Sequence, residues 1–345
     1  MPDIEIVDLF AGPGGLDVAA KHLGLTATGI EWDDGAKATR KAAELGTEPG
    51  DVRNFGPEKF DDANVLAGGP PCQTYTVAGT GSGRRALEDV LGFAERMAKG
   101  EDVRSDLTRL DDVRTGLVLE PLRWALAAIE QGRAYDAIIL EQVPAVLPVW
   151  VAMGKILESV GYSVDHGVLR AEQFGVPQTR RRAILIARRR EVGAAKMPKP
   201  THRPFRKGVP REAGDPSLKP WVPMREVVKR PQAYEVVSNY GTGGDPKARG
   251  RRTCFEPSAT VTGKISRNRV VALDGRELDR FSHGEAGQLQ TFPEGHPWRG
   301  RDVAQQIGNA IPPVLAAHVL AAALDLEHEV LAKAVDELSG GRITV

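Results

Sequence analysis

An α/β fold with a doubly wound parallel sheet is predicted by three observations on the sequence. Short apolar runs alternate with helical segments through the first 141 residues, which is the pattern of successive strand-helix-strand units. The first apolar run leads into "AGPGG", a glycine-rich turn that suits the start of a helix. Residues 307–338 read as one or two apolar helices, which must pack back on the sheet to bury their apolar face.

Each expected element follows from its residue pattern. Buried strands are expected at 4–10, 26–31, 64–69 and 135–141, and a helix at 16–25. Residues 156–190 then read as helix end, strand, loop and strand, with an antiparallel return at the sheet edge. Because a basic segment follows before the C-terminal helices, we expect the large domain to be split by an inserted module.

Composition excludes several classes of protein. The chain has 345 residues, 41% hydrophobic and 27% charged, which is typical of an ordinary soluble globular protein of about two domains. Two cysteines, Cys72 and Cys254, are too few for a disulfide framework, and Cys254 is interpreted as structural. The N-terminus lacks the features of a signal peptide, so we expect a reducing, cytoplasmic location and no membrane association. The seven histidines show no metal-ligand spacing, and no metal is predicted.

The zero net charge conceals a strong asymmetry. Residues 178–270 carry 23 Lys and Arg against 7 Asp and Glu, which leaves 23 against 39 for the rest of the chain. This basic segment is also rich in Pro and Gly. A loop-rich module that faces a polyanion fits this pattern, and in the cytoplasm the polyanion is most often a nucleic acid. The alternative is a solvated surface or linker.

Candidate ligand-binding residues follow the first two predicted strands, because open parallel sheets bind ligands at the carboxyl ends of their strands. Gly12, Gly14 and Gly15 let the backbone approach a ligand at a helix N-terminus. Glu31 ends the second strand, where a carboxylate can accept hydrogen bonds from two ribose hydroxyls. These residues fit a nicotinamide enzyme as well as an adenosyl-methionine enzyme, although the G-x-G-x-x-G spacing is absent.

A cysteine and a carboxylate follow the next two predicted strands. The stretch "LAGGPPCQTYT" presents Cys72 directly after a rigid Pro-Pro turn, and Glu141 follows the apolar run that precedes it. Hydride transfer needs neither group, whereas methylation of carbon 5 of cytosine needs both. A thiolate adds to carbon 6, an acid at ring nitrogen 3 neutralises the developing charge, and carbon 5 becomes nucleophilic. The pair therefore favours methyl transfer to a pyrimidine carbon.

Six short blocks carry a resemblance to a known family. In chain order they read "DLFAGPGG", "GGPPCQ", "EQV", "FGVPQTRRR", "LQTFPE" and "QIGNAIPP". In this the chain resembles the cytosine-5 DNA methyltransferases over nearly its whole length. The resemblance implies a Rossmann-like methyltransferase sheet with a smaller, loop-rich basic target-recognition domain. We expect a catalytic domain at 1–189, the target-recognition domain at 190–275, and a C-terminal part at 276–345 that returns to the catalytic domain.

The resemblance also implies roles for individual residues. The catalytic set would be Cys72, Glu141, Arg180 and Arg182, of which Arg182 contacts the flipped cytosine and its glutamate neighbour. The S-adenosyl-L-methionine site would comprise Phe10, Gly12, Gly14, Glu31 (ribose), Trp32, Asp51 (adenine amino group), Pro71, Asn309 and Ala310.

Three departures from the family pattern are visible. Gln142 stands where the family's "ENV" has asparagine, and "FSHGE" replaces the usual residues before "LQTFPE". The third departure is an extra stretch at about 84–106, in which an amphipathic helix is predicted from the spacing of Leu87, Val90, Leu91, Ala94 and Met97. We hypothesise that this helix docks on the protein and biases loop closure over DNA; the alternative is a passive surface insertion.

The sequence therefore predicts a site-specific methyltransferase that flips its target cytosine out of double-stranded DNA. Expected partners are that DNA and a cognate restriction endonuclease, with the enzyme itself a monomer. Two alternatives remain: a tRNA cytosine-5 methyltransferase, and a DNA-binding protein with a decayed active site, for which Gln142 is the only support.

Overall fold

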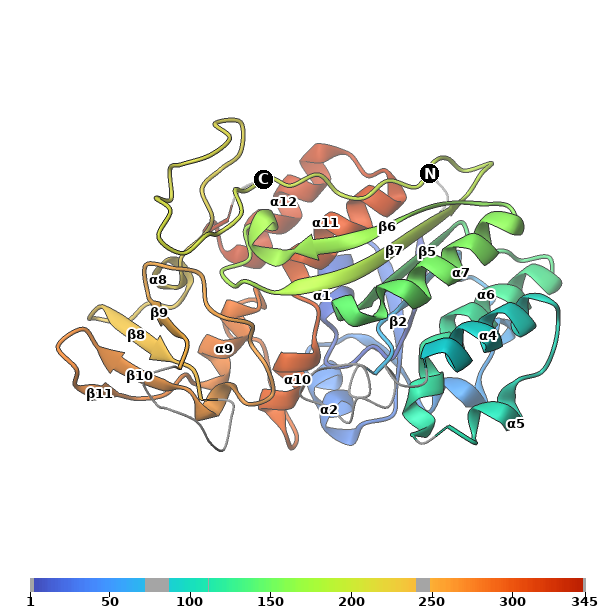
Figure 1. Cartoon of the computed structure of the whole chain (residues 1–345), viewed down its shortest axis with the longest axis horizontal. Helices are drawn as coiled ribbons and strands as arrows, with labels where there is room; N and C mark the ends of the chain where they lie inside the picture. The colour runs from blue at the N-terminus through green and yellow to red at the C-terminus, as the bar shows by residue number, and fades with distance from the viewer. Residues whose placement is uncertain (1–2, 72–86, 111, 240–248, 344–345) are drawn as a thin grey trace.

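The computed structural model describes residues 3–71, 87–110, 112–239 and 249–343. Cys72 lies outside the described residues, as does the segment 79–83 that was expected to form a hinge. Two sheets and the helices packed on them make up the described part of the chain (Figure 1).

The larger sheet has seven strands in the order β3-β2-β1-β4-β5-β7-β6. These are β1 (Glu5–Leu9), β2 (Thr26–Glu31), β3 (Gly46–Pro49), β4 (Val65–Gly68), β5 (Ala137–Gln142), β6 (Tyr162–Arg170) and β7 (Arg181–Arg189). Strands β1 to β5 pair in parallel, whereas β7 runs antiparallel to both β5 and β6. The predicted doubly wound sheet with an antiparallel return is confirmed, and β6 rather than β7 forms the edge.

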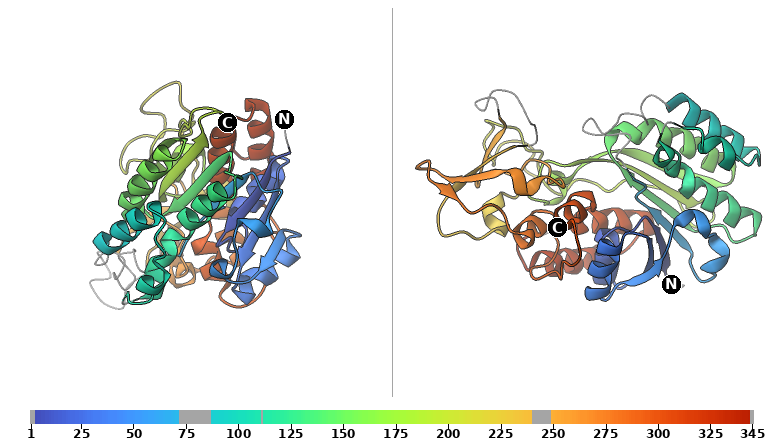
Figure 2. Two further views of the ribbon diagram at one scale, coloured as in Figure 1. Left: turned by 90° about the vertical axis from the view of Figure 1, so that its right-hand side faces the viewer. Right: turned by 90° about the horizontal axis from the view of Figure 1, so that it is seen from below.

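Helices cover both faces of this sheet, because successive strand residues point to opposite sides. Ile6 belongs to one hydrophobic cluster and its neighbour Val7 to the other. The first cluster includes residues of α1 (Gly15–His22), α11 (Pro313–Leu324) and α12 (His328–Ser339). The second includes residues of α4 (Leu87–Ala98), α6 (Glu120–Glu130) and α7 (Leu147–Ser159). Figure 2 shows the sheet enclosed between these two helical layers.

The C-terminal helices return to the sheet as expected. Helices α11 and α12 pack against α1, which follows the first strand. The segment Val303–Leu324 is long and apolar enough to cross a membrane, but 78% of its most apolar window is buried inside the protein. This burial is the property of a core helix.

The helix predicted in the extra stretch is confirmed as α4. Val90 and Ala94 are fully buried, and the helix contacts α6 and α7. A short helix, α5 (Arg104–Leu107), follows it. The extra stretch therefore adds to the helical layer on one face of the sheet.

A second, antiparallel sheet lies beside the first, at the left of Figure 1. Its order is β11-β10-β8-β9, from β8 (Tyr234–Val237), β9 (Arg251–Thr253), β10 (Arg269–Ala272) and β11 (Glu277–Leu278). Helices α8 (Met224–Val227) and α9 (His283–Leu289) lie near it. The expected boundaries at 190 and 275 remain a prediction; β11 lies just beyond the second of them.

Candidate active site

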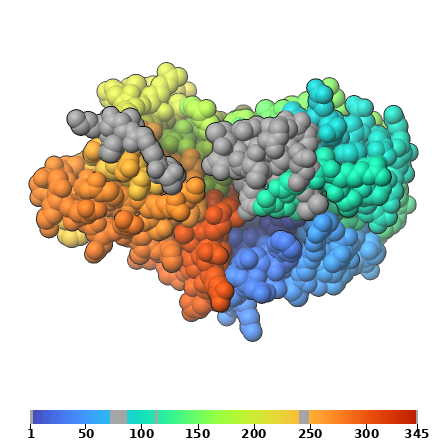
Figure 3. Space-filling model, turned by 60° about the horizontal axis from the view of Figure 1, so that its bottom comes forward, coloured from blue at the N-terminus to red at the C-terminus, as the bar shows by residue number. Residues whose placement is uncertain are grey.

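A cavity of about 1010 Å³ opens at the carboxyl ends of the parallel strands. It is bordered by α2 (Asp34–Ala42) and by α10 (Val303–Asn309), which contact each other although they come from opposite ends of the sequence. Figure 3 shows the two ends of the chain side by side on this face. Ten predicted site residues line the cavity: Phe10, Gly12, Glu31, Trp32, Asp51, Pro71, Glu141, Arg182, Asn309 and Ala310. Gly14 and Arg180 lie behind its wall.

The turn between β1 and α1 is shaped by residues with positive φ. Phe10, Gly12 and Gly14 have φ of 61°, 57° and 97°, a region that favours glycine. At Gly15 the constraint is space, because an added Cβ would lie 2.3 Å from the backbone oxygen of Ile311. The glycines thus bring the start of α1 against the C-terminal segment.

Glu31 ends β2 with its carboxylate held by the backbone. It accepts hydrogen bonds from the amides of Gly12 at 2.7 Å, Trp32 at 2.8 Å and Asp33 at 2.7 Å. Burial raises the pKa of Glu31, and the three backbone hydrogen bonds oppose this effect. The carboxylate therefore has a fixed orientation at the cavity wall, with further acceptor capacity for a diol.

Trp32 and Asp51 lie on the same side of the cavity. The Trp32 side chain is 69% exposed, so its ring is available to a planar ligand. Asp51 accepts hydrogen bonds from the amide and the guanidinium of Arg53. Arg53 lowers the pKa of Asp51, which keeps this carboxylate ionised as a hydrogen-bond acceptor.

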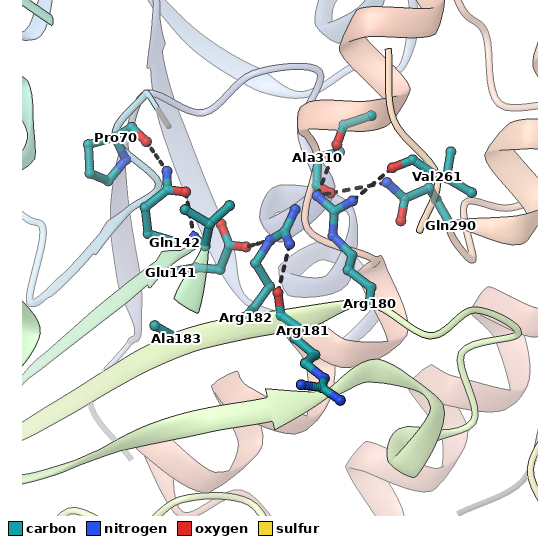
Figure 4. A network of polar contacts seen from close by, with 12 residues as sticks. Pro70, Glu141, Gln142, Arg180, Arg181, Arg182, Ala183, Val261, Gln290 and Ala310 are labelled. Atoms are coloured by element: carbon teal, nitrogen blue, oxygen red, sulfur yellow. Dashed lines mark hydrogen bonds and ion pairs between the residues drawn. The ribbon is translucent and has the colours of Figure 1, made fainter. Parts of the chain in front are cut away.

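The segment that leads to Cys72 is braced from β5. Pairing of β4 with β5 in parallel brings Gly69 and Pro70 beside the end of β5. The Gln142 side-chain amide donates to the carbonyl oxygen of Pro70, and its own oxygen accepts from the Val143 amide at 2.5 Å (Figure 4). Gln142 therefore holds the chain two residues before Cys72, despite its extra methylene.

Glu141 and Arg182 form an ion pair inside the cavity. Arg182 Nε lies 2.5 Å from Glu141 Oε1, and the side chains are 11% and 14% exposed (Figure 4). Pairing of β5 with antiparallel β7 places the two residues on adjacent strands. A cation thus fixes a carboxylate beside the Pro70–Pro71 segment.

Arg180 points away from Glu141 and is 1% exposed. Its guanidinium donates to the carbonyl oxygens of Val261 at 3.0 Å, Gly308 at 2.9 Å and Ala310 at 3.1 Å. Figure 4 shows this arrangement beside Arg182. Arg180 therefore joins the start of β7 to two later segments of the chain. Close to it, the Asn309 side chain accepts a hydrogen bond from Gln305 at 2.6 Å.

Several cavity residues were not found by sequence reasoning. Asp8 was visible as a charged residue inside the apolar run 4–10. Lys264, Arg267 and Gln305 also line the cavity, but nothing in their sequence context distinguishes them from surface residues. Among the described residues, no three His, Cys, Asp or Glu form a group that could hold a metal ion.

The fold and this site define a Rossmann-like methyltransferase. The chain belongs to the C-5 cytosine-specific DNA methylases, whose family pattern matches residues 4–94 and 129–212. It is therefore a DNA cytosine-5 methyltransferase that uses S-adenosyl-L-methionine as the methyl donor and DNA as the substrate. The family match names DNA, and so gives no support to the tRNA alternative.

Individual relatives agree with this assignment. The chain is 27% identical over 328 residues to the type II methyltransferase M.AplI of Arthrospira platensis, covering 91% of this chain and 83% of that protein. It is 26% identical over 347 residues to the type II methyltransferase M.HpaII of Haemophilus parainfluenzae, covering 90% and 87%.

Solved structures share the fold. The S. pombe Dnmt2 methyltransferase superposes with a TM-score of 0.61 at 16% identity, covering 93% of this chain and 98% of that one. The Entamoeba histolytica methyltransferase EhMeth gives 0.60 at 13% identity, covering 94% and 99%.

Proposed function

We propose that Cys72, Glu141 and Arg182 carry out the methyl transfer, with Arg180 as a positioning residue. The observation that carries this proposal is the Glu141–Arg182 ion pair beside the braced Pro70 carbonyl. It places an oriented carboxylate next to the segment from which the nucleophile extends.

The reaction then follows from the groups present. The Cys72 thiolate forms a bond to carbon 6 of the cytosine while Glu141 gives a proton to ring nitrogen 3. The cofactor supplies an electrophilic methyl group, which bonds to carbon 5. Loss of the carbon 5 proton breaks the sulfur–carbon bond, and nitrogen 3 returns its proton to Glu141. Arg182 keeps the carboxylate oriented throughout.

The cofactor fits the cavity beside these residues. Glu31 would accept hydrogen bonds from the ribose hydroxyls, Trp32 would pack on the adenine, and Asp51 would accept from its amino group. Phe10, Gly12 and Gly14 would shape the turn beneath it, and Pro71, Asn309 and Ala310 would close the pocket. The backbone-held Glu31 carboxylate supports this placement.

The target cytosine must leave the duplex, because a thiol cannot reach carbon 6 within the base stack. Residues 190–275 would recognise the DNA sequence, and their basic composition supports this role. Relatives named type II methyltransferases support a cognate restriction endonuclease as partner. We further propose a cytoplasmic monomer.

Bisulfite sequencing of DNA from a host that expresses the chain tests this proposal. Wild-type protein should protect one short sequence at its cytosine, and Glu141→Gln should abolish the protection. A labelled methyl donor offered with duplex DNA or tRNA should label the DNA alone. Protection that survives in Glu141→Gln would contradict the assigned role.

A further inference from the structure

A buried charge cluster lies behind the glycine turn of the cofactor cavity. Its central member is Arg40 of α2, which is fully buried and faces Asp8 of β1, Asp17 of α1 and Glu31 of β2. Strand β3 contributes only a backbone oxygen and a hydroxyl to Arg40. A guanidinium without solvent contact in a surface helix is unusual, because burial of a charge is costly unless it is fully paired.

Arg40 is fully paired and joins three elements. Its two terminal nitrogens donate to the two carboxylate oxygens of Asp17 at 2.9 and 2.8 Å. It also donates to the Gly46 carbonyl oxygen at 2.6 Å and to the Thr47 hydroxyl at 3.0 Å. This bidentate geometry fixes α1, α2 and β3 relative to one another.

The guanidinium packs directly against the backbone that shapes the cavity. A Cβ added at Gly29 would lie 2.3 Å from Arg40 Nη2, and one added at Gly14 would lie 3.3 Å from Nη1. Gly29 precedes Glu31 by two residues on β2, and Gly14 lies in the turn whose Gly12 amide donates to Glu31. Arg40 therefore supports from behind both chain segments that hold the Glu31 carboxylate.

Arg40 also acts on Glu31 through its charge. Burial raises the pKa of Glu31, and the positive charge of Arg40 is among the effects that oppose this rise. Asp8, buried next to the pair, has a pKa well above its ordinary value because of burial and the neighbouring Asp17. A protonated Asp8 adds no negative charge, so Arg40 retains its effect on Glu31.

We propose that Arg40 is a positioning residue for the cofactor: from behind the glycine turn it keeps the Glu31 carboxylate ionised and correctly placed for the ribose. Asp17 holds Arg40 in the required orientation. This inference rests on the proposed placement of the cofactor ribose at Glu31.

Titration calorimetry with S-adenosylhomocysteine over a pH series tests it. The double variant Arg40→Met/Asp17→Asn removes both charges and leaves no unpaired buried ion. Its dissociation constant should rise about tenfold at neutral pH, as expected when a charge-assisted contact is lost. The pH at which affinity falls on acidification should also move upward, since Glu31 would protonate more readily.

Two further variants separate positioning from general stability. Arg40→Lys keeps the charge but loses the fork geometry, so affinity should fall several-fold while the pH midpoint stays at the wild-type value. The matched control Arg230→Met/Glu285→Gln removes another bidentate pair, at 2.7 and 2.8 Å, near the second sheet. It should leave the S-adenosylhomocysteine affinity unchanged.

The outcomes distinguish the two levels of the account. Wild-type affinity and pH dependence in Arg40→Met/Asp17→Asn would overturn the proposal. If that variant does not fold, wild-type affinity in Arg40→Lys would overturn it as well. Failure of the wild-type protein to bind S-adenosylhomocysteine would instead contradict the proposed cofactor site.

Discussion

The brace from Gln142 to the Pro70 carbonyl gives a quantitative prediction. Gln142→Ala removes two hydrogen bonds, one to the Pro70 oxygen and one from the Val143 amide, at a side chain that is 5% exposed. Each such bond contributes about 0.5 to 1.5 kcal/mol, so we expect a loss of about 1 to 3 kcal/mol. If this loss is expressed in the transition state, kcat falls about 5- to 150-fold.

Single-turnover methyl transfer and calorimetry with S-adenosylhomocysteine measure the two relevant quantities. Gln142→Ala should slow transfer while cofactor affinity stays within about twofold of wild type, because Glu31 and its backbone partners are untouched. Gln131→Ala is the matched control, since Gln131 makes one long contact of 3.5 Å at an exposed site. An unchanged rate in Gln142→Ala would refute the bracing role.

Two further predictions concern charge. Lys264 and Arg267 line the cavity without an ion pair among the described residues, so Lys264→Ala/Arg267→Ala should flatten the plot of log DNA affinity against log salt by about 0.9 per lost phosphate contact; an identical slope would place the contacts elsewhere. The raised pKa of Asp8 means that the folded state binds its proton more tightly than the unfolded state, so its contribution to stability is present at low pH and lost as pH rises. Urea unfolding between about pH 5 and pH 8 should therefore favour Asp8→Asn increasingly over wild type as pH rises, and a constant difference would mean that Asp8 is ionised throughout.

The larger sheet was predictable because its strands are short apolar runs separated by helical patterns. The helix α4 was predictable for the same reason, since its apolar residues repeat at helical spacing. The position of β6 at the edge was not, because strand order depends on packing between distant segments rather than on local pattern.

The site shows a similar division. Glu141 and Arg182 could be placed together because each adjoins a predicted strand of one sheet. The buried position of Arg40 could not be predicted, since an arginine in a helix of low hydrophobicity is usually exposed. Its partners Asp17, Gly46 and Thr47 come from elements whose relative placement only the tertiary structure supplies.

The covalent bond to Cys72 is the central claim, and trapping it is the most direct test. Wild-type protein incubated with the cofactor and with DNA that carries 5-fluorocytosine at the target should form an adduct stable to denaturant, because fluorine prevents the final elimination. Peptide mapping should locate the DNA on Cys72, and Cys72→Ser should form no adduct. Absence of an adduct on DNA that wild-type protein demonstrably methylates, or an adduct that persists in Cys72→Ser, would contradict the mechanism.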